Sequence, residues 1–120
     1  MSVKKFDLII DKKIQPYNRV IQVDSDKSLS IRSFLIGAIC QNISSTKNVL
    51  ESEDVLSTIK CLSNLGVKIK KKNPGSYNIY GKGLGSLFAK KGLVLNFGNS
   101  GTLARLLIGI LSTTPDIEVK

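Results

Sequence analysis

Residues 24–40 read DSDKSLSIRSFLIGAIC, in which a short polar turn leads directly into an apolar helical segment. We expect a helix over residues 27–40. Its apolar side chains lie on almost every side, at Leu29, Ile31, Phe34, Leu35, Ile36 and Ile39. A helix that is apolar all round is typically buried between layers rather than lying on a surface. The segment therefore predicts a layered fold built around residues 27–40.

The segments on either side of this helix alternate between strand and helix patterns. Phe6, Leu8 and Ile10 alternate with polar residues, as in a half-buried strand. Further strands are expected at 20–23, 67–69, 77–79, 93–97 and 117–120, with another candidate at 47–50 after a connection at 42–45. The turn signal at residues 73–75 joins the strands at 67–69 and 77–79 in a hairpin.

Two more helices complete the pattern. Ser52 is a suitable N-cap for a helix that ends at Leu65 and Gly66. The leucine and isoleucine spacing of residues 102–111 fits one face of another helix. Helices and short strands in this order predict a mixed α/β (α+β) fold.

The composition is that of a globular domain with a strong positive charge. Of 120 residues, 42% are hydrophobic, and 18 Lys and Arg against 9 Asp and Glu give a formal charge of +9. No apolar stretch approaches the ~20 residues of a membrane-spanning helix. The absence of histidine excludes a catalytic triad and a histidine-based zinc site within this sequence. Without a visible secretory pattern, Cys40 and Cys61 are expected to be reduced, buried thiols in a cytoplasmic protein.

Lys27, Ser28 and Arg32 form the first candidate anion site. A helix N-terminus exposes unpaired N–H groups and a partial positive charge. Lys27 adds an ammonium, Ser28 a hydroxyl donor, and Arg32 a guanidinium that suits phosphate or carboxylate. Ser28 and Arg32 are four residues apart and share a helix face. A structural interpretation, with Ser28 as helix cap and Arg32 in a salt bridge, fits the spacing as well.

Residues 96–105, Asn-Phe-Gly-Asn-Ser-Gly-Thr-Leu-Ala-Arg, form the second candidate. Two glycines around a polar pair let the backbone approach a ligand closely. Arg105 follows Gly101 by four residues, which repeats the spacing of Ser28 and Arg32. The alternative is a capping turn, with Asn99 as the cap and Arg105 on a solvated face.

Together these segments resemble the family of 3-phosphoshikimate 1-carboxyvinyltransferase, or EPSP synthase, in its N-terminal portion. The resemblance rests on residues 26–32, on Glu53-Asp54 before a helix that ends Leu65-Gly66-Val67, and on residues 98–105. A related family that acts on UDP-N-acetylglucosamine shares the fold. It is less similar, because it has Asn rather than Ser after the corresponding lysine and lacks the Gly-Asn-Ser-Gly-Thr run.

The resemblance implies an enzyme of chorismate and aromatic amino-acid biosynthesis. It implies transfer of the enolpyruvyl group of phosphoenolpyruvate to the 5-hydroxyl of shikimate 3-phosphate, with release of phosphate. Lys27, Ser28 and Arg32 are implied to bind shikimate 3-phosphate. The family uses no metal and no organic cofactor, takes small-molecule substrates rather than nucleic acid or membrane, and is expected to be monomeric.

The resemblance assigns the second loop to the other substrate. Lys27, Asn99 and Gly101 are implied to bind phosphoenolpyruvate, and Thr102 and Arg105 to support the loop. No acid–base pair for catalysis is identified within the 120 residues, because the available carboxylates have the positions of helix-cap and first-turn residues. The family's catalytic groups lie on a later part of a longer chain.

The implied architecture is two similar domains built of βαβαββ units. Unit one would cover about residues 20–80. The start of unit two would cover about residues 93–120, where this unit would be truncated. Residues 1–21 would pack as a strand region on the second domain, and 22–120 would be a partial N-terminal domain. Asp24-Ser25 stands where the family usually has Pro-Gly. We expect the 120-residue chain to be catalytically inactive alone while binding shikimate 3-phosphate weakly.

Two other classes fit the charge and length. A small basic module for nucleic acid or another polyanion would show clustered arginine and interleaved aromatics. The chain has three Arg among its 18 basic residues, and seven aromatics without Trp. An inert fragment with exposed apolar edges is the third interpretation.

Overall fold

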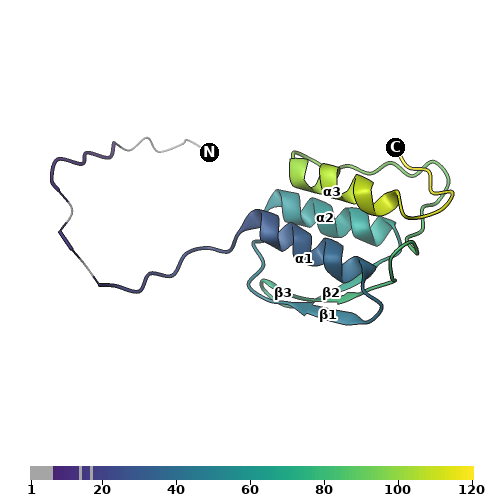
Figure 1. Cartoon of the computed structure of the whole chain (residues 1–120), viewed down its shortest axis with the longest axis horizontal. Helices are drawn as coiled ribbons and strands as arrows, with labels where there is room; N and C mark the ends of the chain where they lie inside the picture. Colours follow the sequence, from purple (N-terminus) through teal and green to yellow (C-terminus); the bar gives the residue numbers. More distant parts are fainter. Residues whose placement is uncertain (1–6, 14, 17) are drawn as a thin grey trace.

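The computed structural model describes residues 7–13, 15–16 and 18–120. The elements are α1 (Lys27–Ile39), β1 (Ile43–Thr46), α2 (Glu53–Asn64), β2 (Lys68–Asn73), β3 (Ser76–Tyr80) and α3 (Gly101–Leu111). Figure 1 shows the helices on one side of the sheet. The mixed α/β class predicted from the sequence is confirmed.

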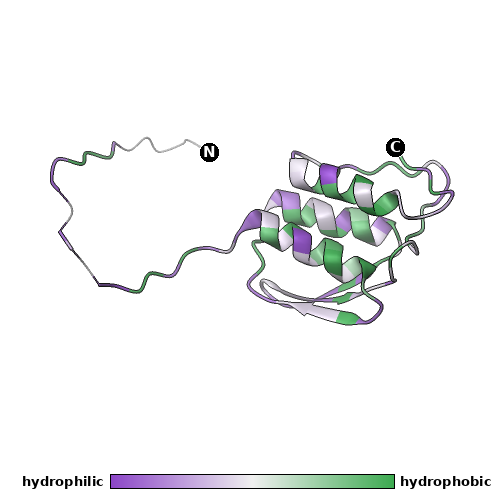
Figure 2. Cartoon of the chain, viewed as in Figure 1, coloured by the Kyte–Doolittle hydropathy of each residue, from purple (hydrophilic) through white to green (hydrophobic). Residues whose placement is uncertain are grey.

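Helix α1 is the central element, since it contacts α2, α3, β1 and β3. Its core face carries Ile31, Phe34, Leu35 and Ala38, all 2% exposed or less. The Phe34 ring meets the Tyr77 ring edge to face, with centroids 5.2 Å apart. The prediction of a helix between layers is right for this face. It is wrong for the opposite side, where Leu29 and Ile36 are 63% and 60% exposed. Figure 2 shows the hydrophobic residues along the three helices.

The sheet is antiparallel, with the strand order β1-β3-β2. The predicted hairpin is confirmed: β2 and β3 pair through Ile69 and Ile79 and turn at residues 74–75. The predicted strand at 47–50 is wrong, because the strand lies at Ile43–Thr46, where a connection was expected. Asn48 has a φ of 55°, which lies in the left-handed region. This conformation is incompatible with an extended strand over residues 47–50.

The sheet meets α1 closely where β3 ends. A Cβ at Gly81 would overlap the carbonyl oxygens of Gly37 and Cys40. Gly81 N–H donates to the Asn42 carbonyl at 3.2 Å, and Lys82 N–H donates to the Ala38 carbonyl at 2.9 Å. The absence of a side chain at Gly81 therefore sets how closely the sheet approaches the end of α1.

The N-terminal strand predictions are not supported. Residues 7–13, 15–16 and 18–26 contain no strand, and the chain runs away from the helices in Figure 1. Val20, Ile21 and Val23 are at least 72% exposed, so the strand expected at 20–23 is absent. Phe6 lies outside the described residues. An isolated strand leaves its N–H and C=O groups unpaired and is unstable without a neighbour.

The C-terminal part follows the predicted order with weaker strands. Helix α3 buries Leu103, Leu107 and Leu111 as its spacing predicted, but Leu106, which the spacing places on the same face, is 39% exposed. Residues 93–97 and 117–120 form no regular strand. Two hydrogen bonds nevertheless join them: Leu95 N–H donates to the Lys120 carbonyl at 2.7 Å, and Lys120 N–H donates to the Leu93 carbonyl at 2.9 Å. This is the bonding pattern of a parallel strand pair.

Candidate functional site

The N-termini of α1, α2 and α3 meet at one corner of the fold. Lys27, the first residue of α1, contacts Asp54 in the first turn of α2. Ser28, the next residue of α1, contacts Thr102 in the first turn of α3. Figure 1 shows the three helices with their N-terminal ends on the same side. Each end carries a partial positive charge and unpaired N–H groups, so the corner favours anions.

Lys27 is held at this corner by a carboxylate. Its ammonium lies 2.7 Å from Asp54 Oδ2, and the two side chains are 48% and 13% exposed respectively. The sequence indicated Asp54 only as a first-turn helix carboxylate, which its place in α2 confirms. Its contact with Lys27 was missed, because nothing in the sequence spacing places residues 27 and 54 side by side.

Ser28 does not cap α1. Asp26 is the N-cap, and its carboxylate accepts from the Leu29 N–H at 2.6 Å. The Ser28 and Thr102 hydroxyls lie 3.5 Å apart, which joins the two loops that the sequence singled out separately. The structural interpretation of Ser28 as a cap is therefore wrong, and its hydroxyl lies at the corner.

Arg32 and Arg105 each lie one turn inside their helix and are exposed. Within the described part of the chain, neither has a carboxylate at ion-pair distance, so the salt bridge considered for Arg32 is absent. Arg32 borders an apolar groove of about 260 Å³ between α1 and α3, together with Leu35, Ile36 and Leu106. Arg105 lies off the buried face of α3, as its position in the helix predicted.

The second loop is held at both ends. Gly98, with φ of 58°, donates its N–H to Asn96 Oδ1 at 2.8 Å. Ser100 is the N-cap of α3 and accepts from the Leu103 N–H at 3.1 Å, so the interpretation of Asn99 as the cap is wrong. Asn99 and Gly101 are exposed at the start of α3, and a Cβ at Gly101 would meet nothing within 4 Å.

Below this loop, Cys61 of α2 is buried and its thiol donates to the Asn96 carbonyl at 3.3 Å. Burial raises the pKa of the Cys61 thiol. Both Cys61 and Cys40 are free thiols, as predicted, but the prediction that both are buried is wrong for Cys40, which is half-buried. Cys61 therefore supports the loop as a neutral, buried group.

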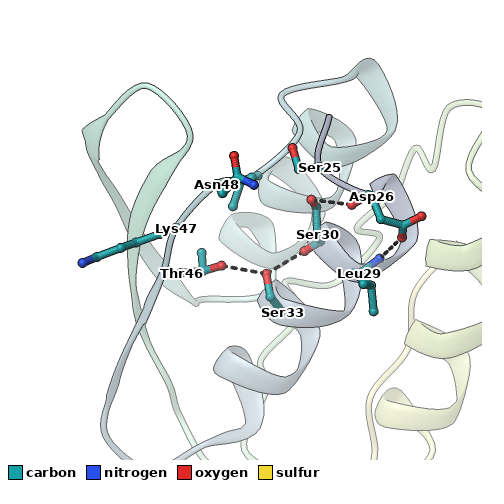
Figure 3. Close-up of a pocket in the computed structure, with 9 residues that line it drawn as sticks. Ser25, Asp26, Leu29, Ser30, Ser33, Thr46, Lys47 and Asn48 are labelled. Carbon is teal, nitrogen blue, oxygen red and sulfur yellow. Dashed lines mark hydrogen bonds between the residues drawn. The ribbon is translucent and has the colours of Figure 1, made fainter. Parts of the chain in front are cut away.

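A polar pocket of about 300 Å³ lies beside α1 but is lined by none of the predicted ligand residues (Figure 3). Ser30 donates to the Asp26 carbonyl at 2.7 Å and accepts from the Leu50 N–H at 3.0 Å. Ser33 donates to the Ser30 carbonyl at 2.7 Å and accepts from Thr46 at 3.2 Å. These hydroxyls bind one another and the backbone, so they fasten α1 to the segment after β1.

A second lysine–carboxylate pair lies on the hairpin. Glu51 accepts from the Lys71 ammonium at 3.0 Å, from the Tyr77 hydroxyl at 2.5 Å and from the Gly75 N–H at 3.1 Å. The hydrogen bond from Lys71, followed by those from Tyr77 and Gly75, lowers the pKa of Glu51 to about 2. Burial and the Glu51 hydrogen bond raise the pKa of Tyr77. This cluster ties the hairpin turn to the segment before α2.

The described residues hold neither a metal-ligand cluster nor a membrane-spanning helix. No group of three or more His, Cys, Asp or Glu side chains gathers there as a metal site. No helix in the same part of the chain has the length and apolarity required to cross a membrane.

The chain is similar to a single family over most of its length. The model of that family, EPSP synthase (3-phosphoshikimate 1-carboxyvinyltransferase), matches residues 12–120. The 3-phosphoshikimate 1-carboxyvinyltransferase of Desulforamulus reducens is 45% identical over 95 residues, which are 79% of this chain and 22% of the relative. That of Vesicomyosocius okutanii is 46% identical over 103 residues, which are 82% of this chain and 23% of the relative.

A solved structure, EPSP synthase from Acinetobacter baumannii, has a TM-score of 0.69 and 40% identity. The match covers 77% of this chain and 21% of that one. The chain therefore spans between a fifth and a quarter of the length of these relatives. On the sequence match over residues 12–120 and the agreement in fold, the chain belongs to the EPSP synthase family.

Proposed function

We propose that this chain forms the N-terminal part of an enzyme that transfers the enolpyruvyl group of phosphoenolpyruvate to the 5-hydroxyl of shikimate 3-phosphate. The observation that carries the proposal is the meeting of three helix N-termini around Lys27 and Ser28. Both substrates carry phosphate and carboxylate groups, which helix N-termini, ammonium and guanidinium groups bind. The relatives' name, 3-phosphoshikimate 1-carboxyvinyltransferase, also specifies 3-phosphoshikimate as the substrate.

In this proposal the first loop binds shikimate 3-phosphate through Lys27, Ser28 and Arg32. The exposed Arg32 guanidinium, without an ion pair among the described residues, is available to an anion. The ammonium of Lys27 has three donors and gives one to Asp54, which leaves donors for a ligand. Both loops face one corner, so one lysine can contact both substrates.

The second loop binds phosphoenolpyruvate through Lys27, Asn99 and Gly101. Asn99 and Gly101 are exposed beside the N-terminus of α3, where open space at Gly101 lets a ligand approach the backbone. Thr102 supports the loop through its contact with Ser28. Arg105 supports it from the next turn of the helix.

The proposed reaction needs acid–base groups that the residues at this corner do not supply. Addition of the hydroxyl and elimination of phosphate require a general acid and a general base. Among the described carboxylates near the corner, Asp26 and Asp54 are engaged as an N-cap and as the partner of Lys27, and Glu53 is an exposed first-turn residue of α2. We therefore propose that the acid–base groups lie in the part of the relatives that this chain does not cover.

We further propose that residues 22–120 belong to an N-terminal domain of βαβαββ units. One unit covers about residues 20–80, and the first part of a second unit covers about residues 93–120. The bonds between Leu93, Leu95 and Lys120 support a strand pair in the second unit. Residues 1–21 would pack on another domain, which agrees with the exposure of Leu8, Ile9 and Ile10. The free cysteines favour a cytoplasmic enzyme, which we propose to be monomeric.

Calorimetric titration of the 120-residue chain tests the proposal. Shikimate 3-phosphate should bind weakly, shikimate should bind much more weakly because it lacks the phosphate, and no turnover should follow when phosphoenolpyruvate is added. Equal binding of shikimate and shikimate 3-phosphate would contradict the assignment of a phosphate-dependent site. Turnover by the chain would contradict the placement of the acid–base groups outside it.

The nucleic-acid alternative has one observation in its favour. Lys68 and Lys70 lie 5.0 and 6.0 Å from the Tyr80 ring centroid, a basic and aromatic group on the sheet. Titration with random-sequence single-stranded DNA at several salt concentrations separates the two functions. Tight binding with a steep salt dependence would support the module, whereas the enzyme assignment predicts weak binding.

A further inference from the structure

The Lys27–Asp54 ion pair has features of a positioning contact rather than of a surface salt bridge. Asp54 is largely buried at 13% exposure, whereas the lysine stem reaches it from the first residue of α1 and remains 48% exposed. Exposed ion pairs contribute little to stability, because the charges are screened and two long side chains must be ordered. Here one partner is short, half-buried and fixed to a helix, so mainly the lysine needs ordering.

The neighbouring residue shows that this arrangement is specific. Glu53 occupies the same first turn of α2, where a carboxylate interacts favourably with the helix dipole. Glu53 is exposed and forms no ion pair within the described residues. The dipole therefore accounts for an acidic residue in this turn but not for the inward position of Asp54. What distinguishes Asp54 is its contact with the Lys27 ammonium.

The contact also answers a physical difficulty of the corner. A lysine side chain is a flexible four-carbon stem, and its freedom is lost when it binds a ligand. A carboxylate that already holds the ammonium removes much of that loss before the ligand arrives. Asp54 can thus favour binding although its own charge repels an anion.

We propose that Asp54 is a positioning residue that holds the Lys27 ammonium at the corner, ready for the anionic group of the substrate. This inference rests on the proposed function, since it takes the corner as the site of shikimate 3-phosphate. Asp54 acts through Lys27 and does not touch the substrate. The Lys27 donors that do not face Asp54 bind the anion.

The test compares Asp54→Asn with Glu53→Gln in the 120-residue chain. Each variant removes one carboxylate from the first turn of α2, but only Asp54→Asn removes the partner of Lys27. Shikimate 3-phosphate is titrated into each. Asp54→Asn should weaken binding between about three- and tenfold, because the ammonium is no longer held in place. Glu53→Gln should leave binding unchanged or slightly tighter.

The direction of the change separates positioning from charge alone. If Asp54 acted only through its negative charge, Asp54→Asn would tighten anion binding, and that result would overturn the proposal. NMR relaxation of the Lys27 side chain measures its mobility, which does not depend on the overall stability of the chain. Its Cε group should be more mobile in Asp54→Asn than in the original chain and unchanged in Glu53→Gln.

A second variant covers the case in which Asp54→Asn does not fold. Asp54→Glu keeps the charge and moves the carboxylate by one methylene, so it should also weaken binding, whereas a purely electrostatic role predicts no change. Lys27→Met separates this inference from the proposed function. If Lys27→Met binds as the original chain does, the proposed site itself fails. If Lys27→Met loses binding and Asp54→Asn does not, only the positioning role fails.

Discussion

Two lysine–carboxylate pairs of nearly equal length lie on this fold. Lys27 and Asp54 are 2.7 Å apart, and Lys71 and Glu51 are 2.8 Å apart, with the lysines 48% and 49% exposed. Glu51 also accepts from a tyrosine hydroxyl and a backbone N–H, so its oxygens are fully engaged. The Lys27 pair instead lies where helix N-termini leave N–H donors available. The comparison shows that the surroundings of an ion pair, rather than its distance, indicate whether it serves structure or binding.

Gly81→Ala should have the largest effect, because it disturbs the close contact between the C-terminal end of α1 and the sheet that carries the second pair. A Cβ there overlaps the carbonyl oxygens of Gly37 in α1 and of Cys40, the residue that follows α1. Overpacking of this kind costs roughly 1–3 kcal/mol of unfolding free energy, measurable by urea denaturation. Gly109→Ala is the control, since its Cβ meets nothing within 4 Å inside α3 and should stabilise the chain by about 0.5–1 kcal/mol. Equal effects of the two changes would contradict the close approach at Gly81.

Lys27→Met and Lys71→Met test the functional difference between the pairs. Lys27→Met should weaken binding of shikimate 3-phosphate by at least about tenfold, the size expected for loss of a hydrogen bond to a charged group. Lys71→Met removes the same charge from the hairpin and should leave the dissociation constant unchanged. Calorimetry measures both. A similar loss in both variants would mean that overall charge, not the corner, binds the ligand.

Glu51→Gln tests the structural role of the other pair through pH. The pKa of Glu51 is lowered to about 2 from an ordinary value of 4.5, so its ionised form stabilises the fold. This contribution is complete above pH 4.5 and is lost as the pH falls from 4.5 toward 2. The original chain should therefore melt at a higher temperature than Glu51→Gln at pH 7, and the difference should shrink toward pH 2.

Circular dichroism at several pH values measures this difference. Glu118→Gln is the control, because Glu118 is exposed and forms no ion pair within the described residues. A melting difference for Glu51→Gln that stays constant between pH 7 and pH 2 would show that the charge of Glu51 does not matter.

Tyr77→Phe should have the smallest effect of the series. The change removes the hydroxyl that donates to Glu51 but keeps the ring packed on Phe34. Loss of one hydrogen bond should lower the unfolding free energy by about 1 kcal/mol, measured by urea denaturation. Binding of shikimate 3-phosphate should not change. Altered binding would mean that the hairpin cluster and the corner are coupled.

The sequence was sufficient for the elements whose signals are local. The apolar periodicity of residues 103–111 and the turn at 73–75 predicted α3 and the hairpin, because a helix stripe and a turn depend on near neighbours. Strand β1 was placed four residues too late. Its residues Ile43–Thr46 are mostly polar, and the apolar Val49 and Leu50 gave the stronger strand signal. Strands at 20–23 need a neighbour, which the described residues do not provide.

In the candidate site, too, the local features were predictable from the sequence and the long-range contacts were not. Lys27 and Ser28 were predicted from their place at a helix N-terminus, a property of the local sequence. Lys27 and Asp54 are separated by 27 positions in the sequence, and Ser28 and Thr102 by 74 positions. Only the packing of the three helices brings the members of each pair together. The substrate roles of these residues remain predictions.

Mapping by NMR shows directly whether shikimate 3-phosphate binds at the corner where the three helix N-termini meet. Amide signals of the ¹⁵N-labelled 120-residue chain are followed as the ligand is added. We expect the signals of residues 27–32, and of Thr102 through its contact with Ser28, to shift with a single dissociation constant, while those of residues 68–77 stay in place. Shifts centred on the lysine-rich hairpin, with the corner unaffected, would contradict this expectation.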